Sequence, residues 1–166
     1  MTTLVLNDAE LFVELDRLIR AALDTRRKLL AFGVRGSTQA IGFIARTSAG
    51  ALTAAAHELA DLLRRLGGRP SVDPRRLDAQ EPNGLTSGQE QDMLRACEAA
   101  LAEVALEYRD ALEWSLPEPA QEVLMRQFGL VIANFEHVKA LRIRLEQGSL
   151  LQTLGASATD ARPSAG

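Results

Sequence analysis

The sequence predicts an all-α protein that folds as a four-helix bundle. Its 166 residues include 26 alanines and 27 leucines, both strong helix formers, whereas aromatic residues account for only 4%. So few aromatic and β-branched residues argue against a β-sandwich or barrel. Four segments also repeat apolar residues at alternating spacings of three and four, the pattern of a helix with one buried face. The length suits one domain with a substantial core.

The first two helices are predicted to form an antiparallel hairpin. Asn7 or Asp8 can cap a helix that ends at Gly33. A second helix over 38–66 ends at a glycine pair that is followed by Pro70. Their apolar faces read Leu11, Leu15, Leu18, Ala22, Thr25, Leu29 and Phe32, then Ala45, Ser48, Leu52, Ala55, Leu59, Leu62 and Leu66.

The last two helices are predicted to form a second hairpin. Ser87 with Glu90, and Ser115 with Glu118, each have the spacing of a capping box at a helix start. Pro117 fits the first turn, where a missing N–H does no harm. The apolar faces read Leu94, Cys97, Leu101, Val104, Tyr108, Ala111 and Ser115, then Ala120, Leu124, Gln127, Val131, Asn134, Val138, Leu141 and Leu145.

The connections predict how the two hairpins are arranged. About twenty residues, 67–86, separate them and include three prolines. At roughly 3.3 Å per residue this segment can cross the whole length of the bundle, so we expect two helical hairpins joined by a long crossover. The alternative is an up-down-up-down bundle with a loose loop. Residues 7–147 form the predicted bundle, and 148–166, rich in Gly, Ser, Ala and Thr, the predicted disordered C-terminal tail.

Charge and composition narrow the class of partner. The net charge of −3 and the short basic run at 26–28 lack the footprint of a nucleic-acid-binding protein. The N-terminus does not resemble a signal peptide, and no apolar run is long enough to span a membrane. We therefore expect a cytoplasmic protein with neither nucleic-acid nor membrane partners. Its single cysteine, Cys97, is expected to be reduced and buried.

The middle of the predicted bundle carries small polar residues instead of charged ones. Four of them, Thr25, Ser48, Gln127 and Asn134, occupy seam positions and can form a hydrogen-bonded core layer. Such neutral groups cannot balance two divalent ions. Asp24, Glu58, Glu98 and Glu103 lie one position beside a seam, where edge metal ligands are one interpretation and solvated boundary residues a commoner one.

An ordered set of short matches resembles an uncharacterised bacterial family of ferritin-like four-helix-bundle proteins, a domain of unknown function. The matches spread over residues 10–145 in consistent order and spacing. They comprise Leu15-x-x-Leu18-Ile19 with Asp24, Glu58-Leu59 with Arg64-Arg65-Leu66-Gly67-Gly68, Cys97-Glu98, Tyr108-Arg109-x-Ala111-Leu112, Arg126-Gln127 and Lys139-Ala140-Leu141-Arg142.

The resemblance implies a ferritin-like fold in which most di-iron ligand positions are replaced. Where similar sequences carry paired Glu, this chain has Arg26 and Arg27. Similar sequences carry a further Glu where this chain has Leu101, and often a His where it has Phe135. Of these ligand positions, only Glu98 is retained. An arginine at a ligand position repels a cation. No cofactor is therefore expected, and catalysis is not favoured.

These features favour a non-catalytic interaction or stress-associated protein that forms a homodimer or binds another protein. A second apolar stripe could widen the helix faces for such a partner or simply complete the core. Its residues are Phe12, Ile19, Leu23, Leu30, Leu63, Leu106, Leu130 and Phe135.

Two other functions stay open. One is a residual di-iron-like metal site using Glu58, Glu98 and Glu103 with His57 or His137. The other is a histidine phosphotransfer bundle, because the sequence around His57 faintly resembles His-x-Leu-Lys-Gly. Asp61 at the glycine position would, however, repel phosphate.

Overall fold

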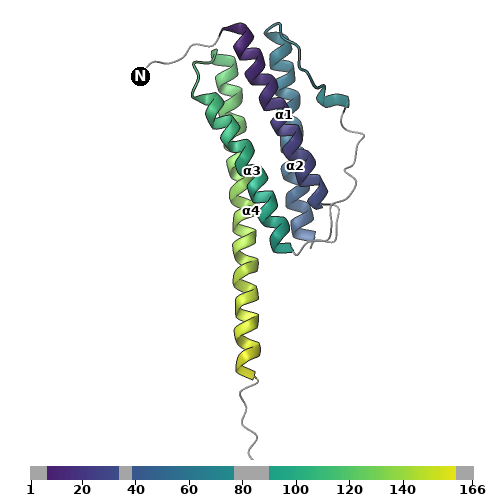
Figure 1. Cartoon of the computed structure of the whole chain (residues 1–166), viewed down its shortest axis with the longest axis vertical. Helices are drawn as coiled ribbons and strands as arrows, with labels where there is room; N and C mark the ends of the chain where they lie inside the picture. The colour runs from purple at the N-terminus through teal and green to yellow at the C-terminus, as the bar shows by residue number, and fades with distance from the viewer. Residues whose placement is uncertain (1–6, 34–38, 77–89, 160–166) are drawn as a thin grey trace, which may run out of the picture.

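The computed structural model describes residues 7–33, 39–76 and 90–159, which form four α-helices and one 3₁₀ turn (Figure 1). The helices are α1 (Asp8–Gly33), α2 (Gln39–Arg65), α3 (Glu90–Leu112) and α4 (Glu118–Thr159), and the 3₁₀ turn η1 is Pro74–Arg76. The all-α prediction is confirmed. None of the described helices is long and apolar enough to cross a bilayer.

The helix ends follow local sequence signals at most of the described boundaries. At the start of α1, the Asn7 side chain accepts from the Glu10 amide at 2.9 Å and the Glu10 carboxylate accepts from the Asn7 amide at 2.9 Å. This is a complete capping box. At the end of α2, Gly67 adopts a φ of 91°, and the amide of Gly68 bonds to the carbonyl of Leu63 at 2.9 Å. Glycine accepts this left-handed geometry without a side-chain clash.

Two other predicted helix caps are not confirmed at their predicted positions. Helix α4 begins at Glu118, and the carbonyl of Pro117 accepts the amides of Ala120 and Gln121. The cap thus lies at Pro117, two residues beyond the cap predicted at Ser115, because the carbonyl of the proline accepts the hydrogen bonds of the first turn. The capping box predicted at Ser87 lies outside the described residues.

The chain direction confirms the predicted topology of two hairpins and a long crossover (Figure 1). Helix α1 packs mainly on α2 and α3, and α4 packs on α3 and α2, so α2 and α3 lie on a diagonal. Helix α2 ends at one end of the bundle and α3 begins at the other (Figure 1). A short loop cannot join two diagonal helices that run in the same direction.

The described start of the crossover is fixed to the bundle. Ser71 donates its amide and its hydroxyl to the carboxylate of Asp16 on α1, at 2.6 and 2.7 Å. Pro74 in η1 is buried. These contacts hold residues 71–76 against α1 and α2.

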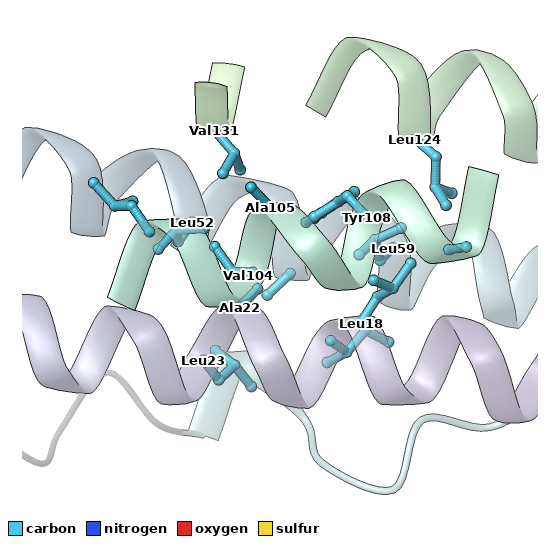
Figure 2. Close-up of a cluster of buried hydrophobic side chains, with 14 of the residues drawn as sticks. Leu18, Ala22, Leu23, Leu52, Leu59, Val104, Ala105, Tyr108, Leu124 and Val131 are labelled. Atoms are coloured by element: carbon cyan, nitrogen blue, oxygen red, sulfur yellow. The ribbon is translucent and has the colours of Figure 1, made fainter. Parts of the chain in front are cut away.

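The core is a continuous layer of leucine, alanine and valine with one large aromatic residue. Figure 2 shows side chains from all four helices pointing into it, among them Leu18, Leu59, Tyr108 and Leu124. Alanines such as Ala22 let the helices approach closely, and the leucines fill the gaps between them.

The C-terminal part of the chain corrects a prediction. Helix α4 continues to Thr159, so 148–159 are helical and the tail predicted to be disordered from residue 148 is wrong over that range. Residues 160–166 lie outside the described residues. One glycine, Gly148, costs a helix only about 1 kcal/mol relative to alanine, and its flanking residues are good helix formers. Leu150 and Leu151 are exposed and do not dock on the bundle. Figure 1 shows the last turns of α4 projecting beyond the other helices.

Candidate functional site

The clearest polar centre inside the bundle is built around Gln127 of α4. Its side-chain oxygen accepts the hydroxyl of Tyr108 at 2.8 Å, and its nitrogen donates to the Glu58 carboxylate at 2.7 Å and to the Ala55 carbonyl at 3.3 Å. Arg126, one residue before it, binds the other oxygen of Glu58. Gln127 thus satisfies a buried hydroxyl on α3 and a carboxylate on α2 together.

The surroundings of this centre set the ionisation of its two acidic groups. Burial, reinforced by the negative charge of Glu58, raises the pKa of the Tyr108 hydroxyl, which stays neutral. Burial would also raise the pKa of Glu58. The hydrogen bonds from Gln127 and Arg126, together with the charges of Arg126 and Arg65, outweigh burial and lower it. Glu58 is therefore a stable carboxylate that points from the core edge toward two donors.

The four residues of the predicted polar layer lie at more than one level of the bundle. Thr25, Ser48 and Gln127 are buried and Asn134 is half-buried. Ser48 and Asn134 line an open hollow between α2 and α4, of about 410 Å³. Ser48 is ten residues from Glu58, the partner of Gln127, which is about 15 Å along α2. The described hydrogen bonds of Gln127 go to Tyr108, Glu58 and Ala55 and not to the other three layer residues.

Each carboxylate proposed as a weak metal ligand is bound by a basic side chain of a neighbouring helix. Glu58 pairs with Arg126 of α4. Glu98 accepts two hydrogen bonds from Arg142 of α4, at 2.5 and 3.3 Å. Glu103 accepts a hydrogen bond from the ammonium group of Lys28 of α1 at 2.7 Å. These partners come from other helices, so sequence spacing did not reveal them.

The pair of Glu98 and Arg142 belongs to a larger network between α3 and α4. Arg142 also donates a hydrogen bond to Glu146 at 3.0 Å, and Arg95 donates to the other oxygen of Glu146 at 3.0 Å. Hydrogen bonds to Glu98 and Glu146 raise the pKa of Arg142, and the bond from Arg142 is the main reason that the pKa of Glu146 is lowered. The network alternates in charge and is balanced by its own members.

Arginines occupy both positions that paired Glu residues hold in the sequences that this chain resembles. Arg26 donates from Nε to the hydroxyl of Thr53 on α2 at 2.9 Å. Arg27 pairs with Asp24 in its own helix at 3.1 Å. A cation at this position would meet two guanidinium groups.

The two histidines lie apart and have different surroundings. His57 is half-buried, and its Nε2 atom is buried with no hydrogen-bond partner within the described part of the chain. A phosphotransfer histidine needs an accessible ring nitrogen, and the Nε2 atom of His57 is not accessible. His137 is exposed and lines the hollow that contains Ser48. Over residues 7–33, 39–76 and 90–159, no three His, Cys, Asp or Glu side chains gather closely enough to hold a metal ion.

Cys97 behaves as a small core residue. It is buried in α3, and burial raises the pKa of its thiol to about 12. A thiol with so high a pKa is a poor nucleophile and a poor metal ligand at neutral pH.

Most of the second apolar stripe completes the core. Ile19, Leu23 and Leu63 are buried, whereas Leu106 and Leu130 are exposed. Six of the exposed large apolar side chains among the described residues lie along α4, whereas Val13, Phe43 and Leu106 lie on the other three helices. The six are Met125, Leu130, Ile132, Ile143, Leu150 and Leu151.

The comparisons with known proteins identify the fold of this chain. No protein-family profile matches the chain, and no curated protein matches it. Among solved structures the chain is similar to a dodecameric thioferritin, the bacterioferritin-related protein from Bacteroides fragilis. The TM-score is 0.72 at 13% identity, over 87% of this chain and 90% of that one. This protein therefore has a ferritin-like fold.

Proposed function

We propose that this protein is a non-catalytic ferritin-like bundle that acts by associating with protein, and first of all with copies of itself. The observation that carries the proposal is the pairing of Glu58, Glu98 and Glu103 with basic side chains of neighbouring helices. These three carboxylates, of which Glu103 is exposed, are already paired with cations that belong to the chain.

The physical reason lies in the charge that a metal centre requires. Two divalent ions need several anionic oxygens with free lone pairs in one pocket. Glu58 is engaged by Gln127 and Arg126, and Glu98 accepts two bonds from Arg142. A metal ion would have to displace these donors and then share its pocket with guanidinium groups.

Self-association is supported by two separate observations. The structural neighbour is described as dodecameric. In this chain, α4 projects beyond the bundle and carries exposed leucine, isoleucine and methionine side chains. Exposed apolar side chains in a row are typical of a surface that another protein covers. A stress-associated role stays a prediction.

Residual metal binding by Glu58, Glu98 and Glu103 is the second candidate, because the structural neighbour is described as a thioferritin. Both candidates are tested on protein purified without chelators. We expect less than one tenth of an equivalent of Fe, Mn or Zn per chain by mass spectrometry, and no saturable uptake of added Fe²⁺ under anaerobic conditions.

The matched variant is Arg142→Leu, which removes the guanidinium from Glu98 and keeps the aliphatic bulk. If cation pairing is what excludes metal, this variant can gain weak binding while the wild type shows none. One metal ion per wild-type chain would refute the proposal. Light scattering completes the test, since we expect a mass of at least two 18.0 kDa chains.

A further inference from the structure

One face of α4 carries a row of exposed apolar side chains that points away from the core. Met125, Ile132, Ile143 and Leu150 are 59%, 37%, 38% and 63% exposed. They are separated by seven, eleven and seven residues. At 100° per residue, seven and eleven residues return to within about 20° of the starting direction. The four side chains therefore form one straight row, called here the outer α4 row.

The outer α4 row is symmetric about its own middle. Reading outward from the point between His137 and Val138, the row meets Lys139 on one side and Glu136 on the other, then Ile143 and Ile132, then Leu150 and Met125. An antiparallel second copy would place each apolar residue opposite an apolar residue. It would also place Glu136 opposite Lys139 at the centre, on both sides of the two-fold axis.

We propose that a second copy of this chain packs antiparallel along the outer α4 row, with the two-fold axis between His137 and Val138. The assignment rests on the self-association proposed above and names its surface. Within one chain, Lys139 and Glu136 are 3.8 Å apart and partly exposed. Opposite charges across a two-fold axis favour this register, because a parallel pair would bring like charges together.

The length of α4 supports the same occupant. Its 42 residues extend about 63 Å. In the antiparallel register, the end that projects beyond one bundle lies beside the start of α4 in the other, so both projecting ends are covered. The row itself spans about 37 Å, but in this register nearly the whole of both α4 helices lies side by side. A contact about 60 Å long and 10 Å wide would bury about 600 Å² per chain, or about 1,200 Å² in total, at the lower end of the range of specific dimers.

The surface beside the row leaves room for the partner. An open hollow between α3 and α4, close to the middle of the row, is lined by Ala99, Ala102 and Phe135 and by the charged side chains of Arg95, Glu98 and Arg142. Small alanine side chains on α3 permit a second helix to approach α4 from outside. The partner would cover the ring of Phe135 as well.

The register is tested by disulfide formation between two variants of the full chain, each with one added cysteine. Met125→Cys and Leu150→Cys are purified separately, then oxidised alone and as a mixture. In the proposed dimer, position 125 of one chain lies opposite position 150 of the other. Two cysteines therefore meet only when one chain is Met125→Cys and its partner is Leu150→Cys. Like positions are offset by 25 residues, about 37 Å along the helix, beyond the reach of a disulfide. The native Cys97 is buried and does not compete.

We expect a cross-linked dimer from the mixture and not from either variant alone. A cross-link from Met125→Cys alone would overturn the antiparallel register. A dimeric wild type without the mixed cross-link would overturn this surface and leave the proposed self-association standing. A single-chain mass at tens of micromolar would overturn both.

A second measurement separates the row from general stickiness of α4. Ile143→Glu should weaken the dimer about tenfold to a hundredfold in sedimentation equilibrium, since two partly exposed apolar side chains are lost per dimer. Leu130→Glu is the matched control, because Leu130 is 52% exposed but lies about 140° around the helix from Met125. Equal weakening by both variants would refute the assignment.

The central charges provide the last test. Glu136→Lys and Lys139→Glu should each weaken the dimer about tenfold, because each places like charges opposite one another twice. The double variant E136K/K139E restores opposite charges and should recover dimerisation. Failure of the double variant to recover would exclude the proposed register.

Discussion

Replacing Gln127 by leucine should destabilise the bundle strongly, because this amide is 2% exposed and serves three partners. Gln127→Leu keeps a side chain of comparable size and removes all three hydrogen bonds. The Tyr108 hydroxyl is left buried and unpaired, at a cost of about 1–3 kcal/mol. Glu58 is about one third exposed and regains water, so its share is smaller.

The expected loss is about 2–3 kcal/mol in the free energy of unfolding, measured by urea denaturation and far-UV circular dichroism. For a chain of this size the melting temperature should fall by roughly 5–10 °C. Gln121→Leu is the control on the same helix, since Gln121 is exposed and its replacement should change stability by less than about 0.5 kcal/mol.

A double-mutant cycle with Tyr108→Phe isolates the bond between the two side chains. Once the hydroxyl is removed, Gln127→Leu should cost less, and the coupling should be about 1–2 kcal/mol. Additive effects of the two substitutions would refute the reasoning, since they would mean that the amide and the hydroxyl do not depend on each other.

Three further predictions concern acid stability, the end of α2 and the buried thiol. The pKa of Glu58 is lowered from its ordinary value of 4.5, so the stability that the folded environment of this carboxylate contributes is present above pH 4.5 and is lost as pH falls through the folded pKa. The stability advantage of the wild type over Glu58→Gln should therefore shrink below about pH 4.5. An unchanged difference in the free energy of unfolding from about pH 6 to 3 would argue against this role of Glu58. Gly67→Ala should cost about 1 kcal/mol because φ is 91°, whereas Gly50→Ala, in an open helical position, should stabilise by up to about 1 kcal/mol in the same urea titration. Cys97, whose thiol pKa burial raises to about 12, should react with a thiol reagent at pH 8 only after unfolding, and rapid labelling of the native protein would contradict its burial.

Much of the fold could be predicted because its signals are local. Apolar residues at spacings of three and four define helix faces without reference to the rest of the chain. The capping box at Asn7 and the glycine stop at Gly67 act within one helical turn. The long proline-containing connection implied a crossover, because a hairpin needs no such length.

The end of α4 could not be predicted because composition is a weak guide to helix continuation. Gly148 and the small polar residues that follow are typical of a tail, yet α4 runs through them to Thr159. The cost of one glycine is small beside the cooperativity of a helix that is already formed over many turns. The exposed outer row on α4 could not be predicted from the apolar seams, because the seams define only the faces that turn inward.

By itself the sequence determined the helices, their hairpins and the chemical types available at the core. Only the tertiary structure decided which groups meet. Gln127 reaches Tyr108 and Glu58, and Glu98 meets Arg142, because the register and rotation of packed helices bring together residues that are distant in the chain. Side-chain pairing across helices depends on differences of a few ångströms, which a periodic pattern does not encode. The seams therefore placed Gln127 in the core, and only the packing gave it Tyr108, Glu58 and the Ala55 carbonyl as partners.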